Sequence, residues 1–180
     1  MKLSSRKLLL LIVLCLALGS VAMAKGQPER KLAPFWTLDL NGQEVSEAIF
    51  SPYKLTMVNI WATFCPVCRQ ELGDLQYLAT KLQPQGVQVV GIIADVNGAD
   101  QKALMESVAL AMHITQGSGV TFTNLLPSED LYDRILKSVQ AVPQTLFVDS
   151  AGTIIGDLHV GAKKVEEWEK IIASTLQRLN

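Results

Sequence analysis

Two cysteines separated by two residues, Cys65 and Cys68, are the side chains best suited to chemistry in this 180-residue chain. An apolar run, Thr56–Phe64, stands directly before them, and a segment with helical periodicity follows. A cysteine pair at a strand-to-helix junction can close a small disulfide and open it again. The spacing and the context therefore predict a redox site.

The two cysteines are expected to have different tasks. Pro66 suits the first turn of a helix and places Cys65 at the helix N-terminus, where unpaired N–H groups and the helix dipole favour a thiolate. Cys65 should attack a substrate disulfide, and Cys68 should then attack the mixed disulfide. Two other interpretations of the pair remain open, namely a structural disulfide and half of a metal site. The metal site would need His113, His159 or carboxylates, but neither histidine has a partner at ligand spacing, and both are interpreted as structural or surface residues.

The N-terminal segment resembles an export signal. Basic residues at 2, 6 and 7 precede an apolar stretch, Leu8–Leu18, and Ala22–Ala24 matches a cleavage site. The longer apolar stretch from Leu8 to Ala24, which has 17 residues, is also at the short limit for a membrane span. We predict a signal peptide or N-terminal membrane anchor over 1–24, a linker over 25–32 and one domain over 33–180, outside the cytoplasm. Cys15 belongs to the export segment, so Cys65 and Cys68 are the remaining cysteines.

The charge balance narrows the class of partner. The chain carries 16 basic and 17 acidic residues, and the export segment holds three of the basic ones and no acidic one. The remainder has 13 basic against 17 acidic residues, a net charge of −4. A weakly acidic domain without a basic cluster argues against nucleic acid as a partner.

The hydrophobic pattern predicts an α/β domain. Leu55–Trp61 and Val87–Ala94 are apolar runs typical of buried strands, and the helix between them makes them parallel. We expect a mixed central sheet with helices on both faces. The other expected elements are a hairpin over 35–45 with a type I′ turn at Asn41-Gly42, helices over 66–82, 100–112 and 164–179, a short helix after Ser128, and antiparallel strands over 144–148 and 153–160.

The segment Trp61–Glu71 resembles the active-site segment of the TlpA/ResA family of exported or membrane-tethered thiol–disulfide oxidoreductases. The resemblance runs from about Ala33 to the C-terminus and includes the stretch Val142–Gly152, which is similar to the family's proline loop, strand and turn. It implies a thioredoxin-like fold with an N-terminal β-hairpin extension. It also implies electrons from a membrane thiol donor, a reductive role toward extracytoplasmic proteins such as apocytochromes, and no cofactor besides the cysteine pair.

Two further site predictions involve Glu71 and Pro143. Glu71 lies three residues after Cys68 on one helix face, and the family places there an acidic residue that accepts the proton of the second cysteine. The alternative is an ordinary solvated glutamate. Pro143 matches the family's cis-proline, which would expose the Val142 backbone beside Cys65 for pairing with a substrate strand.

The aromatic and apolar neighbours of the motif are expected to contact substrate, namely Trp61, Phe64 and Pro66. Phe64 stands where the family usually has tryptophan, and Gly73 replaces a common proline. Trp36, Trp61 and Trp168 are predicted to be core residues.

Asn59 occupies the position of a buried aspartate in cytoplasmic thioredoxins. It cannot transfer a proton, which increases the need for Glu71.

Other functions stay open at this point. The same residues would serve an oxidant that forms disulfides, because only the reduction potential separates the two directions. A metal or haem-delivery chaperone would use Cys65 and Cys68 as ligands. A peroxidase is disfavoured, because Val58 and Ala62 stand where the peroxiredoxin pattern has proline and threonine or serine.

Overall fold

The computed structural model describes residues 30–97 and 100–179, so the predicted export segment lies outside the described residues. The strands are β1 (Trp36–Leu38), β2 (Glu44–Ser46), β3 (Leu55–Trp61), β4 (Val87–Ile93), β5 (Asn124–Leu125), β6 (Gln144–Val148) and β7 (Ile154–Val160). Within the described residues, the α-helices are α2 (Pro66–Leu82), α3 (Gln101–Gly117), α4 (Glu129–Arg134) and α5 (Val165–Gln177), and the short 3-10 helices are η1 (Glu47–Phe50), η2 (Gln83–Gln85) and η3 (Leu136–Ser138).

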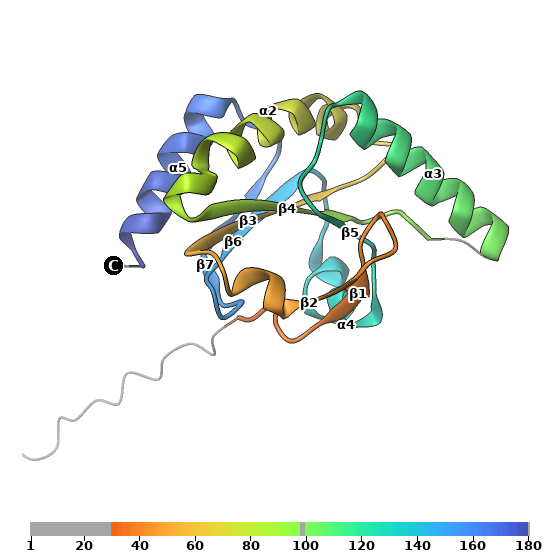
Figure 1. Cartoon of the computed structure of the whole chain (residues 1–180), viewed down its shortest axis with the longest axis horizontal. Coiled ribbons are helices and arrows are strands. Elements are labelled where there is room, and N and C mark those ends of the chain that lie inside the picture. Colours follow the sequence, from red (N-terminus) through yellow and green to blue (C-terminus); the bar gives the residue numbers. More distant parts are fainter. Residues whose placement is uncertain (1–29, 98–99, 180) are drawn as a thin grey trace, which may run out of the picture.

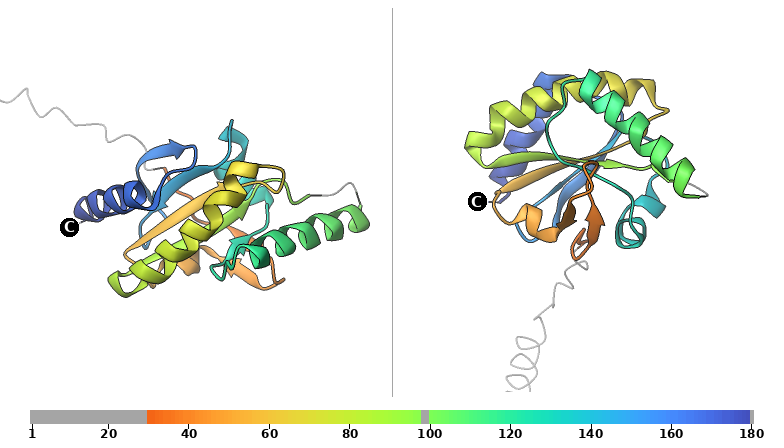
Figure 2. Two further views of the ribbon diagram at one scale, coloured as in Figure 1. Left: turned by 90° about the horizontal axis from the view of Figure 1, so that it is seen from above. Right: turned by 45° about the vertical axis from the view of Figure 1, so that its right-hand side comes forward.

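A mixed five-stranded sheet in the order β5-β4-β3-β6-β7 forms the centre of the domain. Helices α2, α3 and α5 cover one face, while α4 and the β1–β2 hairpin lie against the other (Figures 1 and 2). The predicted mixed sheet with helices on both faces is therefore confirmed. No helix in the described part of the chain is long and apolar enough to cross a bilayer.

Strand β3 lies in the middle of the sheet and leads to the cysteine pair. It pairs in parallel with β4 and antiparallel with β6, and all its residues are buried. Burial on both faces explains its nearly continuous apolar sequence. The carboxyl end of β3 at Trp61 consequently delivers Cys65 to the edge of the sheet, where α2 begins.

Helix α2 has the predicted bounds. Cys65 is its N-cap and Pro66 its first residue, and the helix buries a stripe that includes Cys68, Glu71 and Leu72. Gly73 is exposed and does not interrupt the helix. Gly86 adopts a left-handed conformation with φ 82° directly after η2 and ends the helical segment before β4.

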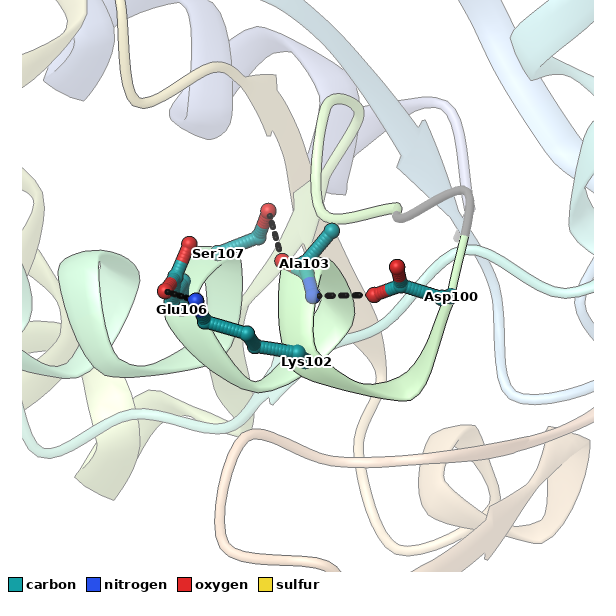
Figure 3. Close-up of polar contacts among 5 residues, drawn as sticks. All are labelled: Asp100, Lys102, Ala103, Glu106 and Ser107. Carbon is teal, nitrogen blue, oxygen red and sulfur yellow. Dashed lines mark hydrogen bonds and ion pairs between the residues drawn. The ribbon is translucent and has the colours of Figure 1, made fainter.

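Helix α3 begins where predicted but ends later. Its N-cap Asp100 accepts a hydrogen bond from the N–H of Ala103 at 2.9 Å, and the Ser107 hydroxyl bonds to the Ala103 carbonyl (Figure 3). The helix continues to Gly117 rather than to about Met112 because Ile114 and Thr115 are buried in its last turn.

The N-terminal hairpin forms with a different turn from the predicted type I′. Asp39 Oδ1 accepts the N–H groups of Asn41 and Gln43, both at 2.8 Å. Gly42 has φ 78°, whereas Asn41 keeps a negative φ, so the first of the two positive φ values of a type I′ turn is missing. The Asp39 carboxylate stabilises the alternative turn.

Two further predictions need correction at this end of the domain. Trp36 is 52% exposed instead of buried, because β1 presents alternate residues to the outside while Thr37 faces inward. The end of the predicted linker belongs to the domain. Leu32 is buried, and its N–H donates to the carbonyl of Gly152 at 2.9 Å.

Candidate active site

Cys65 and Cys68 form a disulfide with their Cα atoms 5.3 Å apart. The two cysteines differ in exposure, since Cys65 is 7% exposed and Cys68 only 1%. The N–H of Cys68 donates to Cys65 Sγ at 3.1 Å, so the helix N-terminus offers a donor to the sulfur of the more exposed cysteine. Such a donor favours the thiolate form after reduction.

The described residues offer no alternative metal site. No group of three or more histidine, cysteine, aspartate or glutamate side chains in that part of the chain is arranged to hold a metal ion. His113 lies on the surface. His159 packs edge-on against Phe147 and Trp168, and its burial lowers its pKa.

The Val142–Pro143 peptide bond is cis, as the resemblance implied. The carbonyl oxygen of Val142 lies 3.7 Å from Cys65 Sγ, so this loop and the cysteine meet although 77 residues separate them. Pro143 is itself buried, and its carbonyl oxygen accepts the N–H of Gly161 at 2.8 Å. The position predicted for the Val142 backbone beside Cys65 is thereby confirmed.

A cavity of about 830 Å³ opens beside Cys65. Phe64 and Pro66 line it from the motif side and Val142 from the proline loop. Phe64 is 73% exposed and Tyr132, from α4, is 57% exposed, so aromatic rings border the cavity on two sides. Its walls are mostly apolar, and the arrangement can receive an extended segment next to the disulfide.

Asp95 is a site residue that the sequence interpretation missed. Its carboxylate accepts hydrogen bonds from the Thr63 N–H at 2.9 Å and from the Thr63 hydroxyl at 2.6 Å. This aspartate follows the end of β4, next to the parallel end of β3, and thereby fixes the residues that lead into Cys65. Asp95 could have been found from its position just after a parallel strand, because the carboxyl ends of parallel strands meet at one edge of the sheet.

Trp61 supports the cysteines from behind. It is fully buried, belongs to the same apolar cluster as Cys65 and Cys68, and donates its indole N–H to Asn124 Oδ1 at 2.9 Å. A side chain so buried cannot contact a docked substrate, which corrects the expected substrate contact at Trp61. Gly91 is required beneath this pair, since a Cβ atom there would lie 2.0 Å from Asn124 Oδ1.

Glu71 is a buried carboxylate, not a solvated helix residue. It is 4% exposed. Its Oε1 accepts the backbone N–H of Lys163 at 2.9 Å and the indole N–H of Trp168 at 2.8 Å. Burial raises the pKa of Glu71, and the two hydrogen bonds only partly oppose this effect.

The second oxygen of Glu71, Oε2, is buried and accepts no hydrogen bond from the described residues. Residues three apart on a helix are neighbours, so Glu71 lies on the face of α2 that carries Cys68. Cys68 and Glu71 are thus both buried on α2, and the carboxylate keeps one oxygen that accepts no hydrogen bond from the described residues. Asn59, by contrast, donates to the Thr145 hydroxyl at 3.0 Å and is a satisfied polar residue of the strand.

Comparisons with known proteins agree with this geometry. Residues 28–157 match the model of the AhpC/TSA family. The thiol:disulfide interchange protein DsbE of Pasteurella multocida (strain Pm70) is 31% identical over 163 residues, which cover 91% of this chain and 80% of that protein. The thiol-disulfide oxidoreductase ResA of Halalkalibacterium halodurans is 24% identical over 176 residues, which cover 92% of this chain and 93% of that one.

A solved structure confirms the fold. The thioredoxin family thiol:disulfide interchange protein from Chlorobium tepidum TLS has a TM-score of 0.67 at 19% identity, covering 84% of this chain and 99% of that chain. The thioredoxin-like fold implied by the sequence is thus confirmed. The chain belongs to the AhpC/TSA family and is a thiol–disulfide oxidoreductase of the DsbE and ResA type.

Proposed function

We propose that this protein reduces disulfides of other proteins outside the cytoplasm, with Cys65 as nucleophile and Cys68 as resolving thiol. The observation that carries the proposal is the asymmetry of the pair. Cys65 is the more exposed cysteine and its Sγ lies 3.7 Å from the Val142 carbonyl oxygen, whereas Cys68 is buried on the helix face that carries Glu71. Each cysteine therefore has the surroundings that its task requires.

The first step is attack on the substrate. In the reduced protein the Cys65 thiolate attacks one sulfur of a substrate disulfide, which forms a mixed disulfide and releases the other substrate sulfur as a thiolate. The N–H of Cys68 stabilises the Cys65 sulfur before attack. The Val142 backbone offers pairing groups to an extended substrate, and Phe64 and Pro66 border the cavity that receives it.

The second step closes the protein disulfide. Glu71 takes the proton of Cys68 on its free Oε2, and the Cys68 thiolate attacks Cys65 Sγ. The bond between Cys65 and the substrate breaks, and the substrate leaves as a second thiolate. The Cys65–Cys68 disulfide of this structure is the product of that step.

The sequence supports the proposed location and partners. The export-like segment at 1–24 supports a location outside the cytoplasm, with or without retention in the membrane. The cycle needs an external thiol donor to reduce Cys65–Cys68 again, and in our proposal that donor is a membrane thiol carrier. No bound cofactor is required, because the cysteine pair holds the electrons. The resemblance to ResA-type proteins makes apocytochromes awaiting haem candidate substrates.

The direction of electron flow is tested by the reduction potential of the Cys65–Cys68 couple. Equilibration with a thiol buffer of known potential, with the cysteines labelled and analysed by mass, gives this value. We expect a value nearer the roughly −270 mV of thioredoxin than the roughly −120 mV of a strong oxidant. A potential at the oxidising end would reverse the proposed direction and favour a disulfide-forming oxidant.

Measurements on the same reduced protein distinguish an oxidoreductase from a metal or haem-delivery chaperone. The reduced protein should bind no stoichiometric metal or haem and should turn over a peptide disulfide repeatedly. Stoichiometric binding without turnover would contradict the proposal.

A further inference from the structure

Glu71 is held by one oxygen only, and the groups that hold it come from the far end of the chain. Trp168, in the first turn of α5, donates its indole N–H to Oε1, and Lys163 donates its backbone N–H to the same atom. Trp168 is fully buried and Glu71 nearly so. Both donors thus fix the carboxylate in one orientation and leave Oε2 without a partner in the described part of the structure.

The segment that carries these donors also contacts the proline loop. Gly161, two residues before Lys163, donates its N–H to the carbonyl oxygen of Pro143 at 2.8 Å. The connection between β7 and α5 therefore bonds at one point to the loop beside Cys65 and at another to the carboxylate on α2. This arrangement ties the position of Glu71 to the framework of the site rather than to α2 alone.

We propose that Trp168 is a positioning residue for the resolving step: its indole N–H holds Glu71 Oε1 so that Oε2 stays available for the proton of Cys68. This inference rests on the proposed role of Glu71 as proton acceptor. At many core sites, phenylalanine could fill the role of a fully buried tryptophan in packing. The indole N–H directed at a carboxylate is the feature that packing does not require.

The electrostatic surroundings of Glu71 determine in which direction its pKa changes when the indole N–H is removed. Burial is the largest effect and raises the pKa of Glu71, and the nearby negative charge of Asp74 on α2 also raises it. The hydrogen bonds from the Lys163 backbone and the Trp168 indole lower this pKa, as does the positive charge of Lys163. Lys163 also pairs with Glu167 at 2.8 Å, and His159 packs on the Trp168 ring. Because the indole bonds to the ionised carboxylate, its removal raises the pKa of Glu71 and leaves less base at neutral pH.

The test is Trp168→Phe, which keeps an aromatic ring and removes the N–H. Stopped-flow decay of a mixed disulfide between Cys65 and a peptide gives the resolving rate from pH 4 to pH 9. We expect the acid limb of this profile to move upward by about one pH unit, with an about tenfold slower rate on that limb. The rate of the first attack by Cys65 should stay unchanged. Trp36→Phe, the same exchange at an exposed tryptophan, is the matched control.

A double-mutant cycle with Glu71→Gln separates positioning from packing. If the inference holds, Trp168→Phe has no further effect on the resolving rate once Glu71 is glutamine. An equal slowing in both backgrounds, or an unmoved pH profile, would overturn the inference and leave Glu71 in its role. If Glu71→Gln itself leaves resolution unchanged, the role of Glu71 fails and this inference with it. Benzothienylalanine at position 168, an isostere without the N–H, gives the same readout if the phenylalanine variant does not fold.

Discussion

The Cys65→Ser variant is expected to lose disulfide reductase activity by a factor on the order of 10⁴ or more, as happens when a catalytic nucleophile is removed. A serine hydroxyl is not ionised at neutral pH, whereas the Cys65 sulfur is placed where a helix N-terminus favours the thiolate. Turnover of a fluorogenic peptide disulfide, with dithiothreitol as the electron donor, measures the effect.

Folding of this variant can be checked independently. Serine is a favourable N-cap residue and can accept the N–H of Cys68 as the Cys65 sulfur does. Its unfolding curve under reducing conditions should therefore match that of the reduced wild-type protein. Loss of activity together with an unchanged unfolding curve assigns the effect to chemistry, while retained activity would remove Cys65 from the mechanism.

Replacement of Glu71 by glutamine should slow the resolving step by about 10²-fold at pH 7, within the range usual for loss of a general base. Glutamine keeps the size of the side chain but cannot take a proton from Cys68. Burial raises the pKa of Glu71, so the wild-type rate should rise with pH through a limb that lies above the usual range of glutamate. That limb should be absent in the variant, and the deficit should shrink at alkaline pH as Cys68 ionises without help.

Glu106→Gln supplies a matched control for this exchange. Glu106 is an exposed glutamate on α3 that pairs with Lys102 at 3.8 Å, so its loss changes the net charge equally without touching the site. The control should resolve the mixed disulfide at the wild-type rate. A Glu71→Gln profile that keeps the acid limb would show that another group accepts the proton.

The sequence carried enough information for the framework of the site. Leu55–Trp61 is apolar because β3 is covered on both faces, and Pro66 marks the start of α2, so the cysteine pair could be placed at their junction. The cis bond before Pro143 and its position next to Cys65 followed from the resemblance of the proline loop rather than from local pattern. The local pattern thus predicts the strand-to-helix junction, and the family motif predicts the proline loop.

The supporting contacts could not be obtained from the sequence in the same way. Whether Glu71 is solvated depends on Lys163 and Trp168, which lie 92 and 97 residues later in the chain. Asn124 likewise meets Trp61 across 63 residues. Single polar residues carry no periodic signal, and only the folded chain shows which of them meet.

Local competition explains the remaining differences. The turn at Asn41-Gly42 was predicted from a dipeptide preference, but the Asp39 side chain bonds to the turn backbone and selects another geometry. Trp36 is predicted to be a core residue, but the hairpin is a separate two-stranded sheet with one outward face. The residue type alone does not determine which face of a short strand is covered.

Trapping of the mixed disulfide tests the central claim most directly. Cys68→Ser removes the resolving thiol, so this variant should accumulate a mixed disulfide between Cys65 and a disulfide substrate. Dithiothreitol should cleave this adduct. Mass analysis of the peptide that contains Cys65 should show the adduct in this variant and not in Cys65→Ser/Cys68→Ser. Absence of any adduct on Cys65, with Cys65→Ser still active in reduction, would contradict the assignment of the two cysteines.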